Sequence, residues 1–310
     1  MKKSMQVMIP IIIIVFVSMI CGGCYYAFYS GISKNSPYTE NQNANITFKN
    51  EEYPKIMATY SMENLVDKIR ENLTGSFQDE QCGSENEIID KLINNEIDIA
   101  IVPELTNEQR EKLVSSGKTF ESFTLTKDAL VFMTSASNSL DNLMSSDLVK
   151  IYSGEIENWS SLGGKDLEIK AYQKSKGSYI QSLVESKLMK NTKMKDPVKE
   201  NLIGDEIAIG NLTSEYYNEE GRIGYTLYNY YKLMYNNQNE GVYNPDKLLS
   251  VDSISPTKEN MLNNSYPYTI TYYIIINSSN PQGNNVRKWV GTMLSEKGKN
   301  IIKEAGYIAN

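Results

Sequence analysis

The sequence predicts an α/β protein of two lobes, and three observations support this fold class. After about residue 50, short apolar runs with strand-like alternation take turns with amphipathic helical patterns. A chain of 310 residues is long enough for two domains, each with its own core. Two long extended stretches, 123–134 and 268–276, are suited to carry the chain from one lobe to the other. We expect residues 51–133 and 252–310 to form lobe 1, and residues 134–251 to form lobe 2.

Residues 1–30 are predicted to be a membrane anchor or signal segment. Two lysines precede an apolar run over 7–28, about the ~20 residues that a bilayer-spanning helix needs. Aromatic residues over 25–29 favour a permanent anchor, whereas Gly22-Gly23-Cys24 favours a lipoprotein signal with Cys24 acylated. The length of the run favours the uncleaved anchor. The polar, Asn-rich stretch 31–50 is then a linker, and the lobes lie on the extracytoplasmic side of the cell membrane.

Composition excludes several classes of function. The net charge of −7 gives no general attraction to nucleic acid. The sequence has no histidine and only three cysteines, of which Cys82 alone lies in the folded part, where we interpret it as a small loop residue. Cysteine–histidine and serine–histidine catalysis are therefore excluded, and no carboxylates have metal-ligand spacing. We expect no enzyme activity, no cofactor and no metal site.

The first lobe begins with a short strand over 53–58. A helix with Leu65, Ile69 and Leu73 on one face follows, and Gly75 ends it. Between the strand and the helix, the turn Thr59-Tyr60-Ser61 offers hydroxyl groups either to an anion or to the helix start as an N-cap.

The remaining elements of the first lobe follow at regular spacing. Residues 84–87 form a capping box for the next helix, residues 97–102 are a buried strand ended by Pro103, and residues 108–113 are helical.

The second lobe opens with a helix over 147–152 that Ser145 or Ser146 could cap. Glycine breaks at 154 and 163–164 precede a half-buried strand over 167–172. After the polar turn 173–177, Ser178 is placed to cap a helix that carries Leu183, Val184 and Leu188. A strand, a polar turn and a hydroxyl at a helix start present backbone N–H groups to an anion.

Further along, residues 187–199 are predicted to be a Lys-rich solvated face, and the chain continues through 206–216 to a strand at 223–225. The tyrosine-dense stretch 225–235 is interpreted chiefly as packing, with one or two rings left to line a ligand site. The final helix is expected to carry apolar residues from Val286 to Ile302, with Gly298 and Gly306 as breaks.

The opening stretch of the second lobe also carries a family resemblance. Ile151-Tyr152-Ser153-Gly154, Asn158-Trp159 and Gly163-Gly164 resemble the run I-[FY]-S-G-x-I-x-N-W-x-x-x-G-G. This run is typical of the phosphate-binding proteins of ABC transporters, the PstS-like branch of the type II periplasmic-binding-protein superfamily. Similarity spans nearly the whole chain after about residue 50, and it includes these segments: 127–132, 223–225, 255–260, 265–268, 294–298 and 305–307.

The resemblance implies a two-lobe periplasmic-binding-protein-like fold with two hinge crossings. It implies an extracytoplasmic solute-binding protein that captures phosphate or a related oxyanion between the lobes and hands it to an ABC permease. The residues implied at the ligand are Thr59, Tyr60, Ser61, Lys174, Ser178 and Tyr179. Glu104 is interpreted as a solvated loop carboxylate, the alternative being a group that accepts a proton from hydrogen phosphate.

Several residues depart from the family pattern, so two alternatives stay open. Lys174 replaces an arginine, Tyr179 a glycine, Ile180 a hydroxyl residue and Met57 an acidic residue. An ammonium group is a point charge, whereas a guanidinium grips two phosphate oxygens at once. The first alternative is the same fold with an organic solute, and the second is a non-transport sensory or partner-binding ectodomain.

Overall fold

The computed structural model describes residues 46–76, 81–198, 202–203, 219–236 and 246–309. The chain forms two compact units. Unit 1 holds the described residues up to Leu125 together with Tyr273–Lys299, and unit 2 holds Thr126–Tyr272 together with the C-terminal residues from Asn300. Both main changes of unit lie inside long strands, β4 (Phe120–Ser135) and β12 (Thr269–Asn277). From the sequence, these changes are predicted at 133–134 and 251–252.

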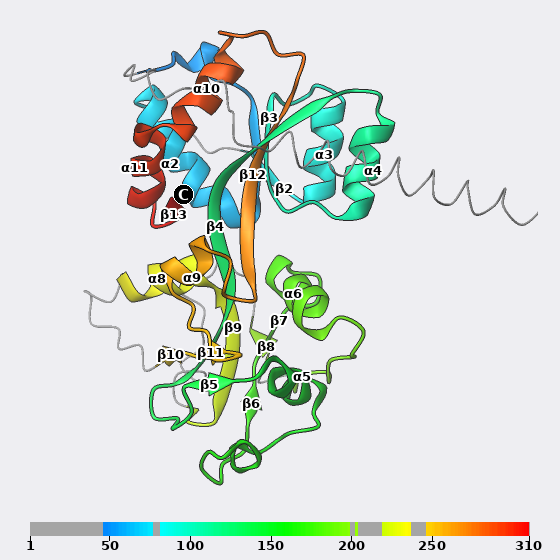
Figure 1. Cartoon of the computed structure of the whole chain (residues 1–310), viewed down its shortest axis with the longest axis vertical. Coiled ribbons are helices and arrows are strands. Elements are labelled where there is room, and N and C mark those ends of the chain that lie inside the picture. Colours follow the sequence, from blue (N-terminus) through cyan, green and yellow to red (C-terminus); the bar gives the residue numbers. More distant parts are fainter. Residues whose placement is uncertain (1–45, 77–80, 199–201, 204–218, 237–245, 310) are drawn as a thin grey trace, which may run out of the picture. The chain divides into compact units, whose positions relative to one another are not determined.

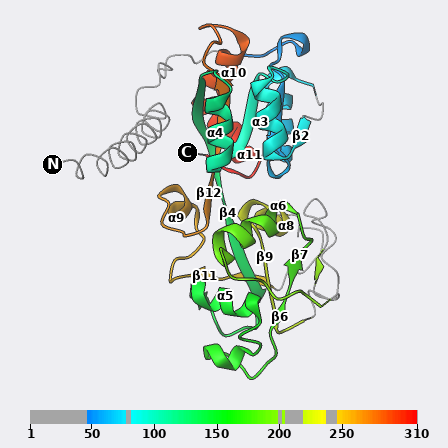
Figure 2. The ribbon, with the colours of Figure 1, turned by 90° about the vertical axis from the view of Figure 1, so that its right-hand side faces the viewer.

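Unit 1 is built on parallel strands with helices on both sides (Figure 1). Strand β1 (Ile56–Thr59) pairs in parallel with β2 (Gln81–Gly83) and with β3 (Ile99–Pro103). Four helices of this unit are α2 (Glu63–Thr74), α3 (Glu85–Ile93), α4 (Asn107–Ser115) and α10 (Asn285–Leu294). Helices α3 and α4 lie side by side in Figures 1 and 2, and they enclose an apolar core with β1 and β3.

Local signals account for several helix ends in unit 1. Gly75 ends α2 in the left-handed conformation with φ of 72°, as the sequence predicts. Ser84 accepts a hydrogen bond from Glu87 N, 3.4 Å away, and so caps α3. The reciprocal capping box lies at α4, between Thr106 and Gln109, a position that the sequence analysis did not single out.

In unit 2, β4 pairs in antiparallel fashion with β9 (Arg222–Leu227), and β9 pairs in parallel with β6 (Lys170–Ala171). Two buried side chains, Arg222 and Asp246, form an ion pair with 2.6 Å between Nε and Oδ1, which joins β9 to β10 (Asp246–Leu248). Two small parallel sheets pair β7 (Gln173–Lys174) with β8 (Leu202–Ile203), and β11 (Ser250–Val251) with β5 (Asn142–Leu143).

The helices that the structure describes in unit 2 are short. They are α5 (Ser145–Ser153), α6 (Tyr179–Leu183) with the π-helix η4 (Val184–Met189) directly after it, α8 (Tyr228–Asn236) and α9 (Lys258–Leu262). Helix α11 (Glu296–Glu304) continues from unit 1 into unit 2, where β13 (Ile308–Ala309) pairs with β4. Three 3₁₀ turns are η1 (Asn50–Glu52), η2 (Tyr60–Met62) and η3 (Trp159–Leu162).

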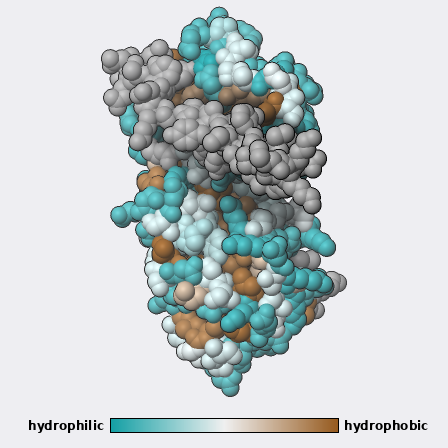
Figure 3. All heavy atoms as spheres, turned by 45° about the vertical axis from the view of Figure 1, so that its right-hand side comes forward, coloured by the Kyte–Doolittle hydropathy of each residue, from teal (hydrophilic) through white to brown (hydrophobic). Residues whose placement is uncertain are grey.

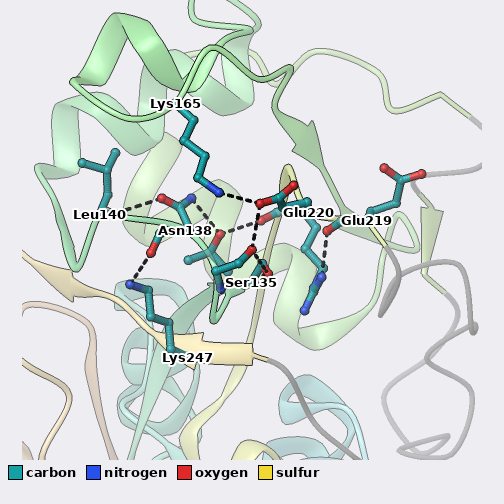
Figure 4. Close-up of polar contacts among 10 residues, drawn as sticks. Ser135, Asn138, Leu140, Lys165, Glu219, Glu220 and Lys247 are labelled. Atoms are coloured by element: carbon teal, nitrogen blue, oxygen red, sulfur yellow. Dashed lines mark hydrogen bonds and ion pairs between the residues drawn. The ribbon is translucent and has the colours of Figure 1, made fainter.

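A polar network holds the loop that follows β4 (Figure 4). Asn138 Nδ2 donates to Thr134 Oγ1 at 3.1 Å, and Asn138 O accepts from Lys247 Nζ at 2.7 Å. Ser137 and Lys165 both donate to Glu220, at 3.2 and 2.7 Å. The end of β4 is therefore fixed to β10 and to the start of β9.

Several sequence predictions need correction. Ser145 does not cap α5, because Met144 is the N-cap and Ser145 N and Oγ both donate to Asp252, at 2.8 and 2.6 Å. The strand expected over 167–172 shrinks to Lys170–Ala171, since Leu167 O and Ile169 N bond back to the preceding segment. Cys82 lies on β2 rather than in a loop.

Gly298 lies inside α11 and does not interrupt it. The tyrosine-dense stretch packs mostly inward, as expected: Tyr225, Tyr230 and Tyr231 are buried, and Tyr228 is half-buried. On the face of unit 2 seen in Figure 3, apolar patches lie among hydrophilic residues, and Met144 and Val198 are exposed apolar side chains of this unit.

Some predictions fall on residues that the structure does not describe. These are the anchor or signal segment with Cys24, the linker up to residue 45, the segment 206–216 and the side chain of Tyr235. Among the helices that are described, none combines the length and the apolar character that crossing a membrane requires.

Candidate functional site

The first candidate loop, Thr59-Tyr60-Ser61, joins the carboxyl end of β1 to the starts of η2 and α2 in unit 1. Thr59 and Ser61 are buried and their hydroxyl oxygens lie 3.3 Å apart, whereas Tyr60 is 49% exposed. Neither hydroxyl caps a helix: Thr59 is the N-cap of η2 without a side-chain bond, and Met62 is the N-cap of α2. Thr59 thus occupies an N-cap position, as one alternative predicts, but its side chain makes no capping hydrogen bond. The loop places two hydroxyls beside the backbone N–H groups at the starts of η2 and α2, whose N-cap residues Thr59 and Met62 make no side-chain cap bond.

The second candidate loop runs from Lys174 on β7 to Ser178 at the start of α6 in unit 2. Ser178 caps this helix, as predicted, by accepting a hydrogen bond from Gln181 N at 3.3 Å. Its hydroxyl oxygen acts there as an acceptor, so the hydroxyl proton is left to donate to an anion. Lys174 is half-buried, and its backbone N donates to Tyr225 Oη at 3.2 Å.

Tyr225 positions this second loop, and the sequence analysis did not foresee that role. It lies on β9, packs edge to face on Tyr152 with 5.3 Å between ring centroids, and is buried. Its Oη accepts from Lys174 N and donates to the side chain of Gln181 on α6. Burial raises the pKa of the Tyr225 hydroxyl, so it stays protonated and able to donate. One hydroxyl therefore joins β7 to the first turn of α6.

The two residues after Ser178 point to different surroundings. Tyr179 is half-buried, and its Oη lies 3.3 Å from Tyr272 Oη on β12. Ile180 is fully buried and belongs to the core of unit 2. The replacement of a family hydroxyl by isoleucine at 180 is thus compensated by apolar packing, whereas Tyr179 adds an aromatic ring and a hydroxyl beside the loop.

The neighbours Lys127 and Asp128 on β4 do not form a pair with each other. Successive side chains of a strand point to opposite faces. Lys127 Nζ donates to Met261 O, Leu262 O and Asn264 Oδ1, at 3.3, 2.8 and 2.7 Å, which satisfies the end of α9. Burial lowers the pKa of Lys127.

Asp128 meets a different helix. It is buried, and Oδ1 accepts from Ala129 N at 2.8 Å and from Asn229 N, in the first turn of α8, at 3.1 Å. Burial raises the pKa of Asp128 to about 7, and the backbone N–H groups limit the rise. Alternation along the strand could have predicted the opposite directions of the two side chains, but not the helices that they meet.

Two further observations concern acidic and cysteine side chains. Glu104 is exposed, which agrees with the interpretation as a solvated carboxylate. Within the described ranges, no group of three or more Cys, Asp or Glu side chains is arranged to hold a metal ion.

Comparison with known proteins places the chain in a family. Residues 80–297 match a family model described as a PBP superfamily domain. The chain belongs to the PBP superfamily. It is 32% identical over 190 residues to the phosphate-binding protein PstS of Borreliella burgdorferi, a match covering 58% of the chain and 63% of that relative. It is 28% identical over 231 residues to PstS of Staphylococcus aureus, covering 71% and 65%. The matches therefore span somewhat less than two thirds of these relatives.

Solved structures agree on the fold of this superfamily member. PstS from Borrelia burgdorferi superposes with a TM-score of 0.62 at 22% identity, covering 83% of the chain and 98% of that structure. An ABC-type phosphate transport receptor from Vibrio cholerae gives a TM-score of 0.64 at 22% identity, covering 82% and 99%. The resemblance to PstS-like proteins is thus confirmed, together with the α/β binding-protein fold. Participation of the six predicted residues in ligand binding stays a prediction.

Proposed function

We propose that this chain is a PstS-like solute-binding protein that captures phosphate or a related oxyanion outside the cytoplasmic membrane. Membership of the PBP superfamily and similarity to proteins named phosphate-binding protein PstS support the proposal. Its partner would be an ABC permease, with the N-terminal segment as the membrane tether. The relatives are named as binding proteins, which supports capture of a ligand without chemistry.

The observation that carries the proposal is the local arrangement shared by two loops. Each loop follows a strand, bears hydroxyl side chains and leads into a helix start. Thr59 and Ser61 supply the hydroxyls in one unit, and Ser178 supplies a hydroxyl in the other. Hydroxyl and N–H donors at helix starts suit an anion, and they let an acidic protein bind one through local geometry. Lys174 adds a positive charge, Tyr60 is the middle residue of the first loop, and Tyr179 directly follows the second.

Titration calorimetry of the full-length chain in mild detergent tests this function. Phosphate is expected to give saturable heat with one site for each chain, and sulfate is the control anion of similar size. Absence of heat with phosphate, at a concentration where the protein is folded by circular dichroism, would contradict the proposal.

Lys174→Gln tests the lysine predicted at the anion. Loss of a charge-assisted hydrogen bond is expected to weaken phosphate binding about tenfold to a hundredfold. Lys150→Gln, an exposed lysine of the same unit on α5, is the matched control and should leave the affinity unchanged. Equal affinities of the two variants would remove Lys174 from the site.

An organic solute is the second candidate, and Tyr179 is the observation that favours it. Its ring, fixed near Tyr272, stands beside the loop where the family pattern has a glycine. A thermal-shift screen with small organic anions distinguishes the two candidates: stabilisation by an organic ligand, with none by phosphate, would select the second.

A further inference from the structure

A pocket of unit 2, separate from the helix start at Ser178, is lined by five lysines. We call it the lysine pocket; its lysines are Lys174, Lys176, Lys190, Lys193 and Lys195. It has a volume of about 430 Å³, and neither Ser178 nor Tyr179 is among its lining residues. Two carboxylates, Glu185 and Asp196, also line it. The five lysines and two carboxylates together give the lining a formal net charge of +3. This excess stands out in a chain whose net charge is −7.

The wall of the lysine pocket formed by residues 190–196 is fixed to the rest of unit 2. Lys195 N donates to Tyr152 O at 2.8 Å, and Lys195 O accepts from Gln173 Nε2 at 2.7 Å. The stem of Lys195 lies against Gly154, where an added Cβ would come within 2.6 Å of Lys195 Cδ. Gln181 Nε2 reaches Met194 Sδ at 3.3 Å. The pocket is therefore a built feature of the fold rather than a chance gap between surface side chains.

Two unusual backbone features border the same pocket. Residues 184–189 form a π-helix, a rare conformation that is frequent at functional sites. Lys190 ends it with φ of 54° and ψ of −100°, a conformation that L-residues rarely adopt. Strained backbone of this kind persists where the surrounding structure holds it, and it is often found at ligand sites. Here it holds the Lys190 side chain at the pocket.

The chemistry of the lining narrows the ligand class. Among the described residues, Lys176, Lys190 and Lys193 make no ion pair, so their charges are available to an anion. Ammonium groups are point charges that suit several separate anionic groups better than one bidentate grip. The volume is in the range of small-molecule sites. Among the described residues that line the pocket, none is aromatic, so they offer no ring for a nucleobase to stack on.

We propose that the lysine pocket binds a short inorganic polyphosphate. Successive phosphate groups would contact Lys176, Lys190 and Lys193, while Lys195, tied to Glu157, forms part of the wall. This site is distinct from the one proposed for a single phosphate, although Lys174 borders it.

The test titrates tripolyphosphate into the full-length chain in detergent, by calorimetry at low and at high ionic strength. The pocket variant combines Lys176→Gln, Lys190→Gln and Lys193→Gln. The control variant combines Lys55→Gln, Lys258→Gln and Lys288→Gln, three exposed lysines outside the pocket, so that the net charge changes equally. Thermal unfolding of each variant establishes that it is folded.

Wild type and control are expected to bind tripolyphosphate with affinity that falls as ionic strength rises. The pocket variant is expected to lose about tenfold or more of that affinity and to keep its orthophosphate affinity. Equal tripolyphosphate affinity in the two triple variants, or no saturable binding by wild type, overturns the proposal. Parallel loss of orthophosphate binding in the pocket variant also overturns it, because both ligands would then share one site. If tripolyphosphate binds as expected while orthophosphate never does, the inference stands and the proposed function fails.

Discussion

Asp128 shows how a single residue acquires a role that its neighbours in sequence do not reveal. Its carboxyl group is buried on β4, and Oδ1 accepts hydrogen bonds from two backbone N–H groups. Within the described part of the chain, Oδ2 has no hydrogen-bond partner. Burial disfavours the charged form, and the raised pKa of about 7 follows from that cost. Asp128 therefore connects the pH of the medium to the packing of α8 against β4.

The raised pKa of Asp128 predicts a definite dependence of stability on pH. The folded state binds the Asp128 proton up to about pH 7, whereas the unfolded state releases it near the ordinary value of 3.8. The folded state thus holds more protons between these values, and stability falls as pH rises through this window. Integrated over the window, this contribution is of the order of 4 kcal/mol.

Asp128→Asn tests this contribution, since the amide resembles the protonated carboxyl and keeps an acceptor for Asn229 N. The free energy of unfolding of the variant should change less than that of wild type between about pH 4 and 7, and exceed it at about pH 8. Urea unfolding across this range gives the measurement. Parallel pH profiles for the two proteins would show that Asp128 is ionised in the folded state throughout.

At the scale of elements, the sequence predicts best what neighbouring residues decide. The caps at Ser84 and Ser178 and the left-handed end at Gly75 depend on hydrogen bonds within three or four residues, and the structure has all three. The strand expected over 167–172 fails for the opposite reason. Alternation suits a strand, but Leu167 O and Ile169 N bond to residues 157–159, so only Lys170–Ala171 joins β9.

The candidate site likewise contains features that the local sequence predicts and features that depend on distant residues. The Ser178 cap is local and predictable. The placement of Lys174 and Gln181 by Tyr225 depends on a strand that lies about fifty residues further along the chain. No local sequence pattern predicts this contact. The π-helix was also missed, because residues 184–189 carry the apolar spacing of an ordinary helix.

Gly298 lies in α11 at a point where this helix approaches α10 closely. Glycine has a low helix propensity, so the sequence predicts a helix break at Gly298. In the structure, α11 continues through this residue. An added Cβ would lie 2.3 Å from Met293 O and 2.4 Å from Met293 Cα, at the end of α10. Close approach of the two helices, rather than a turn, explains the glycine.

Gly298→Ala should therefore destabilise the protein by about 1–3 kcal/mol, although alanine favours helix by about 1 kcal/mol. Asn300→Ala, at an exposed position of the same helix, is the control and should be neutral or slightly stabilising. Thermal unfolding of both variants gives the comparison. If the Gly298→Ala protein were as stable as the control, α10 would be able to shift away from the added methyl group without loss of unfolding free energy.

At the scale of the whole molecule, two long strands belong to both units. β4 and β12 each pass from one unit to the other within a single strand, without an intervening loop. The proposed function requires the protein to lie outside the cytoplasmic membrane, where the ligand arrives. In the proposal, the N-terminal segment holds it there.

The proposed tether is either a permanent transmembrane anchor or the lipid of a lipoprotein, and the two alternatives predict different products. The apolar run over 7–28 is longer than the apolar core of a cleaved signal, and the aromatic residues after it suit a membrane interface. Cys21 stands where lipoprotein signals usually carry an aliphatic side chain. We therefore expect an uncleaved chain whose intact mass includes residue 1 and which resists carbonate extraction from membranes.

Cys24→Ser decides between the two, because a hydroxyl cannot replace the thiol that the lipid modification requires. A permanent anchor predicts that the variant keeps its mass, apart from the single substitution, and stays in the membrane fraction. Wild type should incorporate no labelled fatty acid. Labelling of wild type that disappears in the variant, together with a shortened wild-type chain beginning at Cys24, would contradict the anchor. The protein would then be held by acyl chains rather than by a transmembrane helix.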